Sequence, residues 1–148
     1  MPRIERIATL TWEGNLARGT GTVSGDSGAF TDLPFSLPSR IARENGKASP
    51  EELLAATHGS CITMSLAGEL TQAGLPPTRL DVSCRIVMDE VEGQGHQIVG
   101  SHVEMTASAD GLDDAALQEA ARKADEGCPY SQLLKRAGVD VQVTARLA

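Results

Sequence analysis

Residues 49–70 read SPEELLAATHGSCITMSLAGEL, a stretch that predicts a long helix. Ser49 suits the N-cap, Pro50 the first helical position, and Glu52 the third position of a capping box. Gly74, which two prolines follow, predicts where this helix ends. Its apolar bulk is typical of a core helix, yet polar side chains and one cysteine interrupt its centre: Thr57, His58, Ser60 and Cys61.

Alternating segments on both sides of this helix predict strands. They lie at residues 4–12, 19–25, 28–35, 80–89, 98–107 and 139–147. An irregular loop with Arg40 and Arg43 is expected after the third strand, and a second helix is expected over 113–136 with a pause at Gly127. The order β-β-β-α-β-β-α-β contains no repeated βα unit. We therefore expect a single α+β domain over 1–148, with antiparallel sheets packed around two core helices.

The composition excludes several classes of protein. A net charge of −7 and a pI near 4.9 argue against a nucleic-acid binder. No apolar run is long enough for a spanning helix, and charges at Arg3, Glu5 and Arg6 argue against a signal peptide. A cytoplasmic location is expected, so the cysteines should be thiols, and a disulfide between them would be catalytic or redox-sensing.

The three cysteines differ in their local contexts. Cys84 lies on the apolar side of an alternating strand and is expected to be a core residue. Cys128 lies between Gly127 and Pro129, at the predicted N-cap of a short helix, where the helix dipole favours a thiolate. Cys61 on the central helix could be a buried inert thiol or a reactive one. Together, Cys61 and Cys128 suggest a redox pair.

Other candidate sites are weaker. The segment GTGTVSG lacks the spacing of a dinucleotide loop, and HGSCI does not match a hydrolase elbow. His58 and Cys61 are three residues apart, which could suit a Cys–His nucleophile or half a zinc site. No second ligand pair completes a metal cage, so His58 is expected to be a hydrogen-bonded core or interface residue. His96 and His102 are expected in a hairpin or strand, and no cofactor or metal site is predicted.

Three stretches resemble the OsmC/Ohr family of thiol peroxidases, which reduce organic hydroperoxides. SPEELLAATHGSCITMSLA is similar to the family's peroxidatic helix, and GCPYSQLL to the element around its second cysteine. WEGNLARGTGTVSGDSG is similar to the N-terminal hairpin of the OsmC branch, the osmotically inducible proteins. The resemblance covers nearly the whole chain.

The resemblance implies a role for each of several residues. Cys61 corresponds to the peroxidatic cysteine, Cys128 to the resolving cysteine, and Glu51 to the catalytic carboxylate. The catalytic arginine corresponds to Arg40 if the OsmC branch is followed and to Arg18 if the Ohr branch is followed. The hairpin match and the loop pattern favour Arg40, which would lower the thiol pKa while Glu51 holds its guanidinium by a bidentate pair.

The family also implies an intertwined homodimer with shared active sites and an external reductant of the lipoyl dithiol type. Spacing supports the dimer, because Glu51 and Cys61 would be about 15 Å apart along one continuous helix. Two alternatives stay open at this point. One is a non-enzymatic dimeric module of the same fold that binds a small ligand or senses oxidants; the other is a Cys–His hydrolase.

Overall fold

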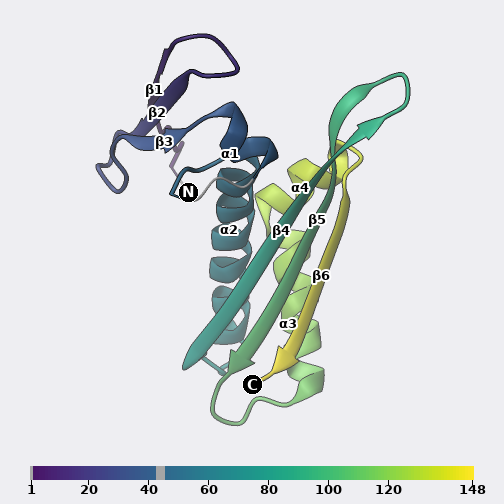
Figure 1. Cartoon of the computed structure of the whole chain (residues 1–148). Coiled ribbons are helices and arrows are strands. Elements are labelled where there is room, and N and C mark those ends of the chain that lie inside the picture. The colour runs from purple at the N-terminus through teal and green to yellow at the C-terminus, as the bar shows by residue number, and fades with distance from the viewer. Residues whose placement is uncertain (1, 43–45) are drawn as a thin grey trace. The chain divides into compact units, whose positions relative to one another are not determined.

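The computed structural model describes residues 2–42 and 46–148, so Arg43 lies outside the described residues. The chain divides into two compact units, Met1–Leu53 and Leu54–Ala148 (Figure 1). The expectation of a single domain stays a prediction.

The first unit contains a small antiparallel sheet. Its strands are β1 (Ala8–Glu13), β2 (Thr20–Gly25) and β3 (Leu33–Phe35), in that order across the sheet. The three strands were predicted, although β1 begins four residues later and β3 is shorter than the sequence pattern indicates. The rings of Trp12 and Phe35 pack with centroids 5.8 Å apart. Gly21 lies against this pair, where a Cβ atom would collide with the Phe35 ring.

A short helix, α1 (Leu37–Ile41), replaces part of the predicted irregular loop. Ser36 is its N-cap and accepts a hydrogen bond from the backbone N–H of Ser39. The Ser39 hydroxyl oxygen accepts one from the backbone N–H of Ser36 in return. This reciprocal capping box uses serine where glutamate or glutamine is typical, so the helix start was not recognised in the sequence.

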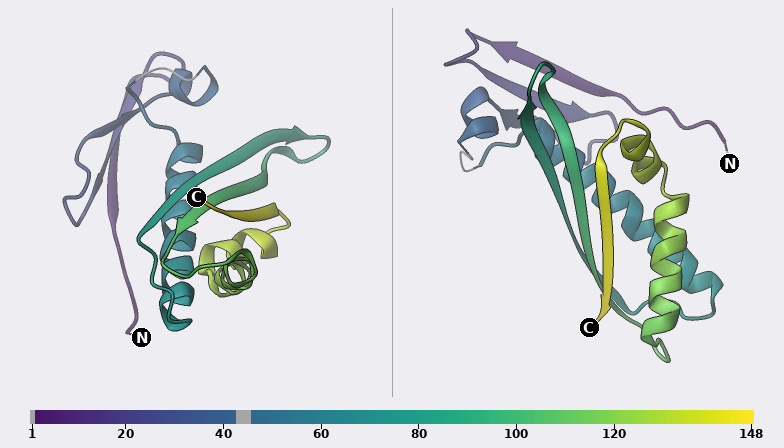
Figure 2. Two further views of the ribbon diagram at one scale, coloured as in Figure 1. Left: turned by 90° about the horizontal axis from the view of Figure 1, so that it is seen from below. Right: turned by 90° about the vertical axis from the view of Figure 1, so that its right-hand side faces the viewer.

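The second unit contains the remaining sheet and most of the helical residues (Figures 1 and 2). Helix α2 (Pro50–Gln72) leads into it from the first unit. The other elements are β4 (Arg79–Val91), β5 (Gly95–Ser108), α3 (Asp114–Gly127), α4 (Pro129–Arg136) and β6 (Asp140–Leu147). The α+β class is therefore confirmed.

The prediction of purely antiparallel sheets is wrong at the last strand. β4 and β5 pair antiparallel, but β6 pairs parallel with β5. Helices α3 and α4 connect β5 to β6 and return the chain to the end of the sheet where β5 began (Figure 1). A connection of this length permits parallel pairing, which a hairpin cannot.

Helices α2 and α3 cover one face of this sheet and form its apolar core. From α2, Ile62, Leu66 and Leu70 are fully buried at helical spacing. They pack in one cluster with alternate residues of β5 and with small residues of α3. The cluster includes Val103, Met105, Ala107, Leu117, Ala120, Ala121, Ala124 and Cys128.

The ends of α2 confirm the sequence signals. The Ser49 hydroxyl accepts a hydrogen bond from the backbone N–H of Glu52. At the other end, Gly74 has a φ of 77°, and the N–H groups of Gly74 and Leu75 donate to Thr71 and Leu70 carbonyls. This is the Schellman arrangement that glycine favours. None of the helices within residues 2–42 and 46–148 is long and apolar enough to cross a membrane.

Candidate active site

In the first unit, the structure pairs two of the candidate residues. Arg40, in the last turn of α1, donates from Nε and Nη2 to the same carboxylate oxygen of Glu51, Oε1, at 2.8 and 2.7 Å. The contact between Arg40 and Glu51 was predicted. The expected bidentate geometry is wrong, because both donors bind the same carboxylate oxygen. The second oxygen, Oε2, is buried and has no hydrogen-bond partner among the described residues. Arg18 is exposed between β1 and β2.

In the second unit, the structure brings Cys61 and Cys128 together. Cys61 is half-buried on α2, and Cys128 is fully buried at the N-cap of α4, the position predicted for it. The Cys128 thiol lies close enough to Cys61 to raise the pKa of Cys61, and the two cysteines are not joined by a disulfide. The backbone N–H of Tyr130 and the hydroxyl of Ser65 also lie close enough to the Cys61 sulfur to affect its pKa.

These contacts act on the Cys61 thiol in opposite directions. Burial is the largest cause that raises the pKa of Cys61 to about 11, and the interaction with Cys128 is the second. The Tyr130 N–H and the Ser65 hydroxyl lower it, because both stabilise the thiolate. Within this unit, burial and Cys128 raise the pKa of Cys61 by more than Tyr130 and Ser65 lower it.

Cys84 has the place expected of a core residue. It is partly buried on β4 and packs against the apolar cluster of α2, α3 and β5. Its sulfur lies 3.6 Å from the hydroxyl of Ser101 and 3.9 Å from Nδ1 of His58. Burial raises the pKa of this thiol as well.

His58 is the hydrogen-bonded core histidine that the sequence favoured. It is fully buried, and burial lowers its pKa. Nδ1 lies 2.7 Å from the Ser101 hydroxyl and Nε2 lies 2.8 Å from the Ser131 hydroxyl. Because both ring nitrogens are occupied, His58 has no free nitrogen to serve as the base of Cys61, and the hydrolase alternative loses its support.

Among residues 2–42 and 46–148, no three side chains of the histidine, cysteine, aspartate or glutamate type gather in a way that could hold a metal ion. His102 instead accepts a hydrogen bond from Arg85 at 2.7 Å, across the paired strands β4 and β5.

Four contributors to the site were not identified from the sequence: Ser65, Ser101, Tyr130 and Ser131. Two of them carried a usable signal. Ser65 lies one helical turn after Cys61, and Ser131 occupies the third position of the helix that Cys128 caps. The contribution of Tyr130 comes from its backbone, so its side-chain identity gives no signal. Ser101 lies far from the cysteines in sequence.

Comparisons with known proteins agree on one family. A family model described as OsmC-like protein matches residues 43–144. Peroxiredoxin OsmC of Escherichia coli (strain K12) is 36% identical over 132 residues, which cover 89% of this chain and 91% of that protein. The organic hydroperoxide resistance protein of Xanthomonas axonopodis pv. citri (strain 306) is 30% identical over 115 residues, covering 76% and 78%.

The fold has solved relatives. The crystal structure of the organic hydroperoxide resistance protein OhrB of Bacillus subtilis matches with a TM-score of 0.73 and 25% identity. The match covers 95% of this chain and 98% of that one. The α+β architecture is therefore shared along nearly the full length of both proteins.

Proposed function

Because the chain belongs to the OsmC-like protein family, we propose that it is a thiol-dependent peroxidase that reduces organic hydroperoxides to alcohols. The names of two relatives, a peroxiredoxin and an organic hydroperoxide resistance protein, support the reaction and the substrate class. The proposal includes a cytoplasmic location, where dithiol reductants keep cysteines reduced.

One observation carries the proposal for this chain's own residues. Cys61 lies on α2 and Cys128 at the start of α4, yet the Cys128 thiol lies close enough to Cys61 to raise the pKa of Cys61. Two neighbouring thiols can form a disulfide without a large movement of the backbone when they lose two protons and an oxidant takes up two electrons. Cys84 belongs to the same unit, but its contacts are with His58 and Ser101.

The proposed reaction has three steps. The Cys61 thiolate attacks the terminal oxygen of the hydroperoxide and the O–O bond breaks, which gives a sulfenic acid and an alkoxide that takes a proton from solvent and leaves as the alcohol. The Cys128 sulfur then attacks the Cys61 sulfur and displaces water, forming a disulfide. An external dithiol reduces this disulfide by thiol–disulfide exchange and is itself oxidised.

The first step needs a positive charge that the second unit does not provide by itself. The nucleophile must be a thiolate, yet burial and Cys128 raise the pKa of Cys61 to about 11. A guanidinium beside the sulfur would lower this pKa and could donate hydrogen bonds to the peroxide. Arg40, oriented by Glu51, is the arginine that we propose for this role.

We further propose that this arginine comes from a second copy of the chain. Helix α2 is continuous from Pro50 to Gln72, so Glu51 and Cys61 are separated by about 15 Å along its axis. They also point to different sides of the helix, since each residue turns the helix by about 100°. A homodimer in which the Arg40–Glu51 pair of one chain meets Cys61 of the other would resolve both difficulties.

The raised pKa of Cys61 also favours a second candidate function. A thiol whose pKa is raised by burial reacts slowly with peroxides, which an oxidant sensor or a ligand-binding module of the same fold could tolerate. Such a protein would form the Cys61–Cys128 disulfide without rapid cycling. Turnover with a dithiol separates the two functions.

The test is consumption of cumene hydroperoxide by the purified protein with dihydrolipoamide as reductant. Cys61→Ser should abolish turnover, and Cys128→Ser should lose rapid cycling with the dithiol. Cys84→Ala is the matched control, because Cys84 is also a partly buried thiol of the second unit and should be dispensable. Absence of turnover in the unaltered protein with any dithiol would overturn the peroxidase proposal.

A further inference from the structure

A buried network of polar side chains connects α2, β5 and α4. His58 of α2 hydrogen-bonds to Ser101 of β5 through Nδ1 and to Ser131 of α4 through Nε2. All three residues are fully buried. Burial of polar groups is costly unless their hydrogen bonds are made, so these contacts constrain three elements at once.

Ser131 connects these hydrogen bonds to the helix that Cys128 caps. Cys128 caps α4, and Ser131 is the third residue of the same turn. On α2, His58 and Cys61 lie three residues apart and therefore on adjacent turns of one face. Helix α2 therefore holds the first turn of α4 through the His58–Ser131 hydrogen bond, near the place where Cys61 lies close to Cys128 and Tyr130.

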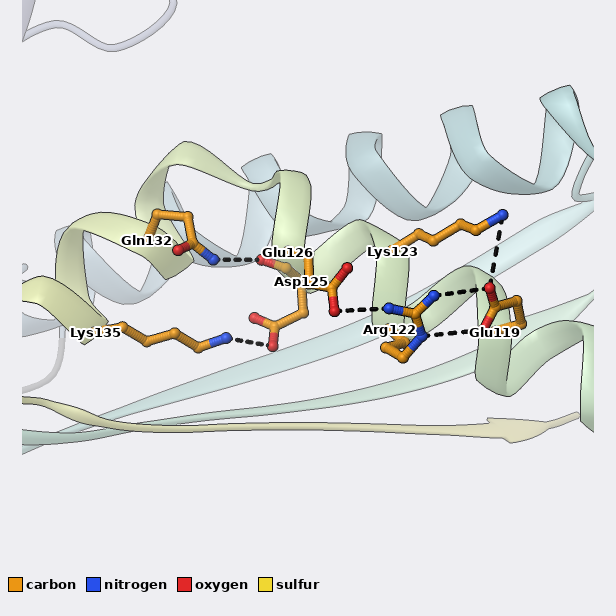
Figure 3. A network of polar contacts seen from close by, with 7 residues as sticks. All are labelled: Glu119, Arg122, Lys123, Asp125, Glu126, Gln132 and Lys135. Carbon is orange, nitrogen blue, oxygen red and sulfur yellow. Dashed lines mark hydrogen bonds and ion pairs between the residues drawn. The ribbon is translucent and has the colours of Figure 1, made fainter.

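Helix α4 needs such contacts because it is short. Its eight residues are too few to be stable without packing, and the Cys128 side chain makes no capping hydrogen bond. Two contacts tie α4 to the end of α3: Lys135 pairs with the carboxylate of Asp125, and the Gln132 amide donates to the Asp125 carbonyl at 3.3 Å (Figure 3). His58 supplies the contact to α2, the helix that carries Cys61.

We infer that His58 is a positioning residue for disulfide formation, which holds the first turn of α4 through Ser131 so that the Cys128 sulfur stays in reach of Cys61. This inference rests on the proposed peroxidase function. In the step concerned, the Cys128 sulfur forms a bond to the Cys61 sulfur of the sulfenic acid, the S–O bond breaks, and water leaves. His58 touches neither reactant and acts through the backbone of α4.

The two serines provide a matched pair of variants. Ser131→Ala and Ser101→Ala each remove one hydroxyl from a fully buried partner of the same imidazole, so their costs in folding stability should be similar. Only Ser131→Ala releases α4. A purely structural role of His58 would make the two variants equivalent in every other measurement.

Two measurements then separate this inference from the proposed function. The first is the equilibrium between the Cys61–Cys128 disulfide and a dithiothreitol redox buffer, which needs no peroxidase activity. The second is the fate of Cys61 after one equivalent of cumene hydroperoxide, followed as disulfide or as sulfenic acid trapped by dimedone. Failure of peroxide to oxidise the unaltered protein would count against the proposed function only, because the first measurement would still test the position of Cys128.

We expect Ser131→Ala to lower the equilibrium constant for disulfide formation roughly three- to tenfold, the range for loss of one hydrogen bond. Sulfenic acid should accumulate in the same variant. Ser101→Ala should stay within about twofold of the unaltered protein on both measurements at a comparable loss of stability. Equal effects of the two variants, or no effect of Ser131→Ala, would overturn the inference.

A second pair of variants covers the case in which a serine variant does not fold. The amide nitrogen of glutamine can take the place of Nε2, and that of asparagine the place of Nδ1. His58→Gln can therefore keep the bond to Ser131, whereas His58→Asn can keep only the bond to Ser101. Disulfide formation closer to normal in His58→Gln than in His58→Asn supports the inference, and the reverse order overturns it.

Discussion

Tyr130, in the first turn of α4, lies close enough to Cys61 on α2 for its backbone N–H to lower the pKa of the Cys61 thiol. The N-terminus of a helix carries free N–H groups and partial positive charge, both of which favour a thiolate. From the sequence, this stabilisation was expected for Cys128, the N-cap residue. In the structure, the Tyr130 donor acts on Cys61, the residue proposed to attack the peroxide.

Removing the Cys128 sulfur should lower the pKa of Cys61. Two of the causes that raise this pKa, the hydrogen bond and the negative charge, come from Cys128, whereas the Tyr130 and Ser65 donors would remain. We expect the rate of Cys61 alkylation in Cys128→Ala to reach half of its plateau at a lower pH than in the unaltered protein. Peptide mass spectrometry after iodoacetamide treatment measures Cys61 separately, and Cys84 in the same samples is the internal control.

An unchanged or higher pKa of Cys61 in Cys128→Ala would contradict the contact between the two thiols. The same result would remove the main support for a disulfide between them.

The sequence predicted those parts of the fold and site whose signals are local. Ser49 and Gly74 mark the ends of α2 through hydrogen bonds within a few residues. The parallel pairing of β6 with β5 depends on how α3 and α4 return the chain, and no local pattern encodes it. Likewise, the bidentate pair expected for Arg40 and Glu51 is wrong, because the sequence does not show which carboxylate oxygen the guanidinium faces.

The role of His58 shows the same limit. Its position on an apolar helix indicated a buried, hydrogen-bonded residue, which the structure confirms. Its partners, Ser101 and Ser131, lie 43 and 73 residues away. Serine is common on surfaces and in turns, so neither position stood out until the fold placed both hydroxyls against one imidazole.

His58 should make the protein less stable in mild acid. Burial lowers its pKa below the ordinary value of 6.5, with Asp125 opposing and Lys135 adding to this effect. The unfolded chain therefore takes up a proton at a higher pH than the folded chain does. The stabilisation from the neutral imidazole is complete above about pH 6.5 and is lost as the pH falls from there towards the folded pKa.

The measurement is urea unfolding between pH 7.5 and about pH 5. His58→Gln cannot take up the proton and should reduce the pH slope of the unfolding free energy by up to about 1.4 kcal/mol per pH unit. His96→Gln is the control, because His96 is exposed at the β4–β5 hairpin. Equal pH slopes in His58→Gln and the unaltered protein would show that His58 does not stay neutral in the fold.

Glu51 and Glu52 are adjacent glutamates that should differ in their effect on activity. Glu51 binds the Arg40 guanidinium, whereas the Glu52 side chain is exposed and its backbone N–H donates to Ser49. We expect Glu51→Gln to lower kcat/KM for cumene hydroperoxide about tenfold or more, since hydrogen bonds to charged groups contribute about 1.5–3 kcal/mol. Glu52→Gln should have little effect.

The effect of Glu51→Gln on folding stability should be small, below about 1 kcal/mol, because Arg40 is partly exposed. Equal activities of the two glutamine variants would exclude Glu51 from the orientation of the catalytic arginine.

If the site is shared between two chains, a mixed dimer of two inactive variants should recover activity. Cys61→Ser and Arg40→Ala should each be inactive as homodimers. A mixed dimer keeps one complete site, made of Cys61 from the Arg40→Ala chain and Arg40 from the Cys61→Ser chain. After unfolding and refolding of an equimolar mixture, about a quarter of the unaltered activity should return, because half of the dimers are mixed and each carries one of two sites.

The two variants refolded separately are the control. A mixture that stays as inactive as its components would place each arginine with the cysteine of its own chain or outside the site.

The most direct test of the two-cysteine peroxidase is the product of a single oxidation. The reduced protein is treated with one equivalent of cumene hydroperoxide, blocked with iodoacetamide and mapped by peptide mass spectrometry. We expect one molecule of cumyl alcohol per chain, a disulfide that joins Cys61 to Cys128, and Cys84 recovered in its alkylated form. Unreacted hydroperoxide with three alkylated cysteines, or a disulfide that includes Cys84, would contradict it.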